Sequence, residues 1–323
     1  MLGKIFSEPL RIILRYIFSL TGNMPVAIII FSVIFTLLYA CFDVYKTRIS
    51  VRNQIAGHYA NKFKDFASEP SVFDDNLTNI YKKCKVNQLS LILLSILGYF
   101  IFIQVINMIY TPLNSVYGFG DEQRAEILNF LIKNYKISES ASDFEIINTI
   151  FNNVKDISQI SGVPQYIYSI ADSGISLFNI NCLMPATFDI TIVFPILLLI
   201  TYLKNAIYSI KNAIKSKTNK AYGLMALNLF FLISIVSAVF IFPIVYFIFI
   251  FTYKLINVLL QKPMTKYKDK YVETIGKQVV PECDTIYNKA KNEFEDIINK
   301  NNCEEKENDD SNIPVAVENE SDK

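Results

Sequence analysis

The sequence predicts an all-α, multi-pass membrane protein with four to five transmembrane helices and small helical segments outside the membrane. Three observations predict this class. Charged residues are nearly absent from four blocks of the 323-residue chain and dense between them. The longest block, 221–261, holds a single charged residue, Lys254, and is twice as long as the roughly 20 apolar residues that cross a bilayer. Basic residues also concentrate in alternate connecting segments, as in proteins with several spans.

Residues 1–23 are expected to form an amphipathic helix. Apolar residues recur in this segment at helical spacing, and Arg11 and Arg15 lie four residues apart, so they share a face. Such a helix can lie in the membrane interface, or it can extend the first span. The sequence leaves both interpretations open.

Two spans have clear boundaries. The first is placed at 24–43, after the break expected at Gly22 and Asn23, and the second at 88–110, before Pro112. A third span, at 187–207, is less regular because its uncharged part is only 14 residues long. The charged residues that flank it are expected to reach the headgroup region.

The block 221–261 has Pro243 near its middle. We expect two short spans, 221–241 and 243–261, that turn at this proline, because five lysines gather at the end of the block, at 254, 262, 266, 268 and 270. If these lysines are cytoplasmic, the block crosses the membrane an even number of times. The alternative is one long, tilted or kinked helix.

The distribution of Lys and Arg predicts the orientation. Segment 46–87 has eight basic residues against four acidic ones, and segment 204–220 has five lysines and no acid. Segment 114–186 has four basic residues against eight acidic ones. Basic residues near span ends favour the cytoplasm. We therefore expect 46–87 and 204–220 inside, 114–186 outside, the N-terminus outside and the C-terminus cytoplasmic, with a bacterial cytoplasmic (inner) membrane as the default location.

The segments outside the membrane are expected to be helical. Spans one and two fill 24–113, with 46–87 as a basic cytoplasmic helical connection, and spans three to five fill 187–262. In the outer segment 114–186, Ser142 and Glu145 match a capping box that starts a helix. This segment is either a binding module or a folded connector.

The C-terminal region has two parts. Residues 263–300 form an expected cytoplasmic helical tail, and an apolar stripe within it could dock on a partner or on the chain's own cytoplasmic segment. The stripe comprises Ile286, Tyr287, Ala290, Phe294, Ile297 and Ile298. Residues 301–323 are acidic and polar and are expected to be disordered.

The sequence contains no recognisable catalytic, nucleotide-binding or metal-binding motif. We therefore expect no enzyme activity, no cofactor and no metal, and a net charge of +1 argues against nucleic-acid binding. His58 is the only histidine, and we expect it to face solvent or to pack. Four polar residues of the spans could make contacts between helices or line a path: Gln104, Asn107, Asn228 and Lys254.

These observations predict a non-enzymatic subunit or scaffold of a membrane-embedded complex, for example secretion or transport machinery. It would contact membrane lipids, and protein partners or further copies of itself, through helical segments on both faces. The alternative is an oligomeric channel or transporter subunit, which requires Gln104, Asn107 and Lys254 to face a shared water-filled path. A membrane-bound enzyme is the third hypothesis.

Overall fold

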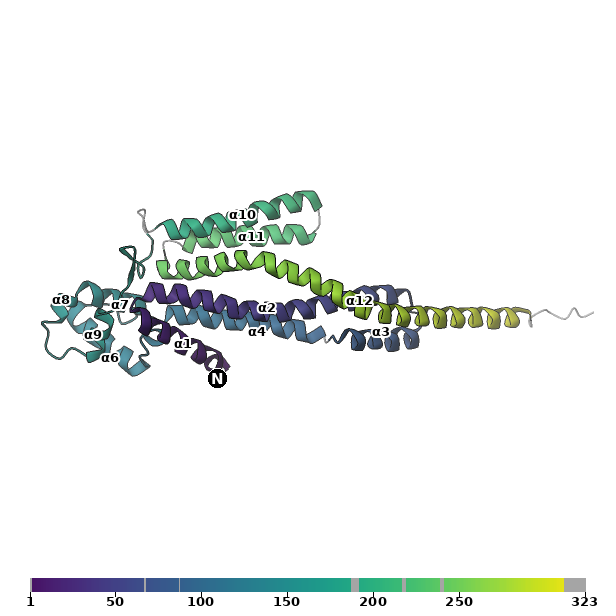
Figure 1. The fold of residues 1–323 in the computed structure, drawn as a ribbon, viewed down its shortest axis with the longest axis horizontal. Helices are drawn as coiled ribbons and strands as arrows, with labels where there is room; N and C mark the ends of the chain where they lie inside the picture. Colours follow the sequence, from purple (N-terminus) through teal and green to yellow (C-terminus); the bar gives the residue numbers. More distant parts are fainter. Residues whose placement is uncertain are drawn as a thin grey trace, which may run out of the picture. The chain divides into compact units, whose positions relative to one another are not determined.

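The computed structural model describes residues 2–66, 68–86, 88–186, 192–216, 219–238 and 241–310, and Figure 1 shows that helices dominate them. The expected all-α class is confirmed, since 83% of the structure is helical. The chain divides into two compact units. Unit 1 comprises Met1–Phe42 and Ile96–Lys262, and unit 2 comprises Asp43–Ser95 and Pro263–Lys323.

Within the described residues, three helices are long and apolar enough to cross a membrane. They are α2 (Met24–Phe63), α4 (Gln88–Tyr110) and α12 (Ile244–Asp310). The spans expected at 24–43, 88–110 and 243–261 fall on these helices. A multi-pass membrane protein is therefore supported.

The expected number of four to five spans is wrong. In the ranges that the structure describes, α10 (Val193–Ser216) and α11 (Asn219–Ala238) carry only short apolar stretches, at Pro195–Lys204 and Met225–Ser234. A helix rises 1.5 Å per residue, so ten residues cover about 15 Å, half of the roughly 30 Å hydrocarbon core. The spans predicted at 187–207 and 221–241 are therefore not candidate spans. The cytoplasmic assignment of 204–220 depended on both of these crossings, so it loses its basis.

The break expected at Pro243 is present. Helix α11 ends at Ala238, α12 starts at Ile244, and Pro243 forms an antiparallel β-bridge with Pro185. One continuous helix over 221–261 is therefore wrong. Helices α10 and α11 pack side by side (Figure 1).

The N-terminal helix α1 (Leu2–Thr21) is separate from α2. Gly22 has a φ of +61°, which reverses the chain, and the Oδ1 of Asn23 accepts a hydrogen bond of 3.1 Å from the backbone NH of Val26. Asn23 thus caps α2, in the role that Asn favours. The reading in which residues 1–23 extend the first span is wrong, and one face of α1 is buried in unit 1 through Leu14 and Ile17.

Unit 1 also contains a small folded segment made from short elements. The predicted capping box is confirmed, because the backbone NH of Glu145 donates to Ser142 Oγ and that of Ser142 donates to a Glu145 carboxylate oxygen. The helices are α5 (Pro112–Ser115), α6 (Asp121–Tyr135), α7 (Asp143–Asn152), α8 (Val154–Ile157) and α9 (Gln165–Ala171). A two-stranded antiparallel hairpin, β1 (Ser176–Leu177) and β2 (Ile180–Asn181), was not expected.

The hairpin turn explains why the sequence signal was weak. Its two central residues, Phe178 and Asn179, have φ values of 52° and 63°. Two successive positive φ values suit a tight hairpin turn, which usually carries Asn-Gly or Asp-Gly. Phe is an unusual choice for such a position, so no turn signal was visible.

Besides the first residues of α4, unit 2 contains three helical segments. They are the second half of α2 with the short 3₁₀ helix η1 (Lys64–Phe66), α3 (Pro70–Cys84) and α12 beyond Pro263. The core contains Ala56, Tyr59, Phe63, Phe66, Val72, Ile80, Cys84, Cys283 and Ala290. Arg52 Nε donates to Tyr271 Oη at 2.9 Å, and Arg48 Nε donates to Tyr267 Oη. These two pairs share one sequence offset, so α2 and α12 run parallel here.

Candidate functional site

The tail stripe of α12 docks on the chain's own segment 46–87. Tyr287 contacts Phe63 and Phe66 with ring centroids 5.5 and 5.6 Å apart, and Phe294 lies 5.1 Å from Phe66. Ala290 is fully buried. The sequence left open whether this stripe meets a partner or the chain itself, and the structure decides for the chain. Ile298 is 37% exposed and is therefore off the packed face.

Helix α3 runs antiparallel to α12. Cys84 Sγ lies 3.8 Å from Cys283 Sγ, and Lys83 Nζ lies 2.9 Å from a carboxylate oxygen of Glu282. At the other end of α3, Val72 lines the same pocket as Ile297. Helix α3 begins at Pro70 and ends at Cys84, before Lys85, whose φ is 50°, so a proline and a left-handed residue set its two ends.

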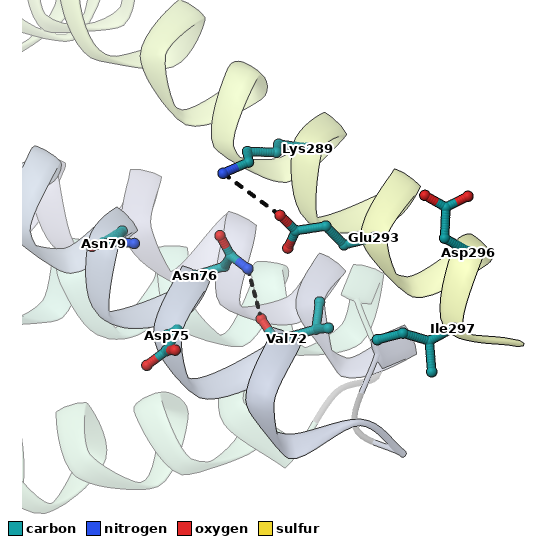
Figure 2. Close-up of a pocket in the computed structure, with 8 residues that line it drawn as sticks. All are labelled: Val72, Asp75, Asn76, Asn79, Lys289, Glu293, Asp296 and Ile297. Atoms are coloured by element: carbon teal, nitrogen blue, oxygen red, sulfur yellow. Dashed lines mark hydrogen bonds and ion pairs between the residues drawn. The ribbon is translucent and has the colours of Figure 1, made fainter. Parts of the chain in front are cut away.

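An open groove lies along this antiparallel seam, and we call it the α3–α12 groove (Figure 2). Its larger part has a volume of about 520 Å³, and an adjoining part shares Asn76, Asn79 and Lys289 with it. The larger part is lined by Val72, Asp75, Asn76, Asn79, Lys289, Glu293, Asp296 and Ile297. The adjoining part adds Lys82, Lys83 and Ile286.

The α3–α12 groove has opposite charges at its two ends. One end carries Asp75, Glu293 and Asp296, and the other carries Lys82 and Lys83. Between them, Lys289 Nζ lies 3.6 Å from Glu293 Oε1, along one face of α12 (Figure 2). The charge pattern follows from the antiparallel packing, which brings the acidic start of α3 beside the acidic end of the stripe.

Amide side chains occupy the middle of the α3–α12 groove. Asn76 Nδ2 donates to the backbone oxygen of Val72 at 3.0 Å, and Figure 2 shows Asn76 facing the α12 side. An amide offers both donors and acceptors, so it suits the polar groups of a polypeptide backbone. The groove therefore has the chemistry of a peptide-binding surface, with Val72 and Ile297 as apolar contacts.

Ile286 and Ile297 belong to the apolar stripe predicted from the sequence, but the polar residues of the groove were not singled out. Asn76 and Asn79 are three apart, and Lys289 and Glu293 are four apart, so each pair shares a helix face. These polar pairs, which lie next to apolar positions on the same helices, were the signal that the sequence offered for a groove. It did not identify the groove because the same pattern marks any solvated helix face.

The four polar residues expected in the spans lie on three helices. Gln104, half-buried, and Asn107, exposed, are on α4, and Asn228 is on α11. Lys254 is on α12, and its Nζ lies 4.9 Å from the ring centroid of Tyr202 on α10. Lys254 is ten residues from the start of α12, which corresponds to about 15 Å along the helix.

Metal and catalytic chemistry gain no support within the described residues. No group of three or more His, Cys, Asp or Glu side chains there could hold a metal ion. His58 is exposed and contacts the ring of its neighbour Tyr59 edge-on, with centroids 5.5 Å apart. Asp189, which flanks the uncharged part of the span predicted at 187–207, lies outside the described residues.

Comparison with protein-family models, with curated proteins and with solved structures gives no match to this chain. The functional argument therefore rests on the geometry of the chain itself.

Proposed function

We propose that this chain is a non-enzymatic membrane protein that acts as a subunit or scaffold of a membrane-embedded complex. Its proposed binding surface is the α3–α12 groove. The observation that carries the proposal is the separation of charge along this groove, acidic at Asp75, Glu293 and Asp296 and basic at Lys82 and Lys83. Complementary charges fix the direction in which a partner segment docks, and like charges exclude the reverse direction.

The partner that suits this groove is a protein segment with a basic end and an acidic end. Asn76 and Asn79 lie between the two charged ends and can bond its polar groups. Val72, Ile286 and Ile297 supply apolar contact. Helices that lead into candidate spans would then hold such a partner near the membrane.

The proposed orientation follows from the basic residues. Three spans are an odd number, so the two ends of the chain lie on opposite sides of the membrane. The excess of Lys and Arg in 46–87 and the lysines at 262, 266, 268 and 270 favour the cytoplasm for the groove and the C-terminus. A reporter fused after Lys323 tests this, and a signal from the outer side would contradict it.

Co-purification tests the partner role. The full chain, in mild detergent from its native membrane, is expected to retain a partner, and Glu293→Lys is expected to reduce recovery about tenfold, equivalent to 1.4 kcal/mol. The matched control is Glu273→Lys. Both glutamates belong to exposed i,i+4 pairs of α12, with Lys289 and Lys277, but only Glu293 lines the groove.

The control is expected to retain the partner, with both variants folded at wild-type thermal stability. Equal loss in both variants, or no partner with the wild type, would refute the proposal.

The alternative function, an oligomeric channel or transporter subunit, gains no specific observation, because Lys254 already has the ring of Tyr202 as a neighbour. Labelling of cysteines placed at 104, 107 and 254 by an aqueous reagent would revive it.

A further inference from the structure

Two buried thiols meet in the core of unit 2. Cys84 is the last residue of α3 and Cys283 belongs to α12, and their Sγ atoms are 3.8 Å apart although the residues are 199 positions apart in sequence. They are 1% and 0% exposed. The proposed partner role does not use this pair.

The surroundings allow the two sulfurs to approach further. A disulfide bond is about 2.05 Å long, so the sulfurs must approach by a little under 2 Å from their separation of 3.8 Å. Cys84 occupies the last position of its helix, followed by Lys85 with a φ of 50°. The last turn of α3 is closed by backbone hydrogen bonds from Lys85 to Lys82 and from Val86 to Tyr81, and a terminal turn opens more readily than a helix centre. The approach therefore needs a small shift of this last turn or a rotation of the two cysteine side chains.

Other cysteines with described side chains are placed differently. Cys41 is exposed and Cys182 is buried in unit 1, where its Sγ lies 3.4 Å from the backbone oxygen of Ile180. The pairing of Cys84 with Cys283 is thus specific to the α3–α12 seam. Next to it, Lys83 and Glu282 form an ion pair that holds the same register.

We propose that Cys84 and Cys283 are a reversible disulfide site that ties α3 to α12 by exchange with a low-molecular-weight disulfide, RSSR. The thiolate of Cys84 attacks one sulfur of RSSR, which forms a mixed disulfide and releases RS⁻. The thiolate of Cys283 then attacks the Cys84 sulfur, the bond between the two Sγ atoms forms, and a second RS⁻ leaves. Two protein thiols are oxidised, RSSR is reduced to two RSH, and the two thiol protons end on the released thiolates.

Burial makes this site slow to react and stable once formed. Desolvation raises the pKa of the Cys84 thiol above its ordinary value, and the thiolate is the attacking species. Exchange therefore requires local opening of the last turn of α3. In a reducing compartment the thiols persist, and the cross-link forms only when the disulfide pool rises. Cross-linking fixes the Lys82–Lys83 end of the groove to α12.

The test uses the full chain in mild detergent, equilibrated with mixtures of reduced and oxidised glutathione and then trapped by acid and alkylation. Peptide mass spectrometry of the wild type is expected to show the Cys84–Cys283 linkage as the main oxidised product, with reversal by dithiothreitol. The thermal midpoint of the oxidised form is expected to rise by about 5 °C. Cys41→Ser is the control that keeps the linkage.

The wild-type measurement decides the proposal without any variant. It is overturned if Cys84 and Cys283 remain free thiols, or carry glutathione, at the most oxidising mixture while the chain stays folded. It is also overturned if linkages to Cys41 or Cys303 match the Cys84–Cys283 linkage in yield. Cys283→Ser is expected to leave Cys84 without a protein disulfide, and an equal yield of cross-linked chain in this variant contradicts the assignment.

Discussion

The hydroxyl of Tyr59 donates a hydrogen bond of 2.6 Å to Asp284 Oδ1, which joins α2 to α12 within unit 2. The Tyr59 hydroxyl oxygen also lies 3.2 Å from the backbone oxygen of Val280. The Tyr59 side chain is otherwise buried, at 2% exposure. This hydroxyl therefore helps to fix the register of the two helices and joins residues 225 positions apart in sequence.

Replacing Tyr59 by Phe is expected to weaken unit 2 by about 2 kcal/mol, because hydrogen bonds to charged groups contribute roughly 1.5–3 kcal/mol. The ring remains, so packing is kept. Hydrogen exchange at the amides of residues 280–287 measures the loss. Tyr45→Phe is the matched control on α2, since Tyr45 is 55% exposed. Equal effects of the two changes would contradict the role of the hydroxyl.

Replacing Asp143 by Ala is expected to destabilise unit 1 by about 2–3 kcal/mol. Asp143 is 6% exposed and accepts hydrogen bonds from Arg124 Nε at 2.7 Å and from the backbone NH of Leu113 at 3.2 Å. Its loss leaves the buried NH unpaired. Thermal unfolding in detergent measures the change, and Glu126→Ala, an exposed acid on α6, should shift the midpoint little. A wild-type midpoint for the Asp143 variant would refute this account.

Replacing Gly98 by Leu is expected to separate α2 from α4. A Cβ at Gly98 would lie 2.7 Å from Tyr39 Oη and 2.9 Å from Phe42 Cε1, closer than side chains pack. Gly98→Ala should cost less, because the tip of Tyr39 can move. In the control position on α11, Gly223, an added Cβ meets nothing within 4 Å, so Gly223→Ala should be neutral or stabilising. Thermal stability in detergent is expected to be lowest for Gly98→Leu, intermediate for Gly98→Ala and highest for Gly223→Ala.

Alkaline pH is expected to weaken unit 1 through Cys182. Burial raises the pKa of this thiol to about 11 from 9.0. Because the folded-state pKa is the higher one, its stabilisation is present below pH 9 and is lost as the pH rises to 11, at roughly 1.4 kcal/mol per unit. The stability advantage of the wild type over Cys182→Ala should therefore shrink between pH 9 and 11. A constant difference would show that the thiol titrates equally in the folded and unfolded states, and it would refute the prediction.

The helix boundaries illustrate which parts of the fold the sequence predicts well. The Ser142–Glu145 capping box and the break before Ile244 both appear where the sequence placed them. Each depends on a few adjacent residues, since a cap bonds within one turn and a proline removes a local NH. Such signals can be read from a single stretch of chain.

The number of spans was overestimated for a related reason. The segments 187–207 and 221–241 had the length of a span, but the uncharged part of the first holds only 14 residues, and α10 begins at Val193 and carries Lys204 and Lys211. The apolar stretch within the helix is therefore shorter than the apolar run in the sequence. Only the positions at which the helices begin and end revealed this difference.

The sequence alone determined the helical class and the apolar segments that support a multi-pass membrane protein, because segregated charge and helical periodicity are local properties of the chain. The tertiary structure decided which surfaces meet: the α12 stripe on the chain's own core, Cys84 beside Cys283, and the acidic and basic ends of the α3–α12 groove. These contacts join residues about 200 positions apart. Their register follows from burying whole helix faces together, and no local pattern encodes it.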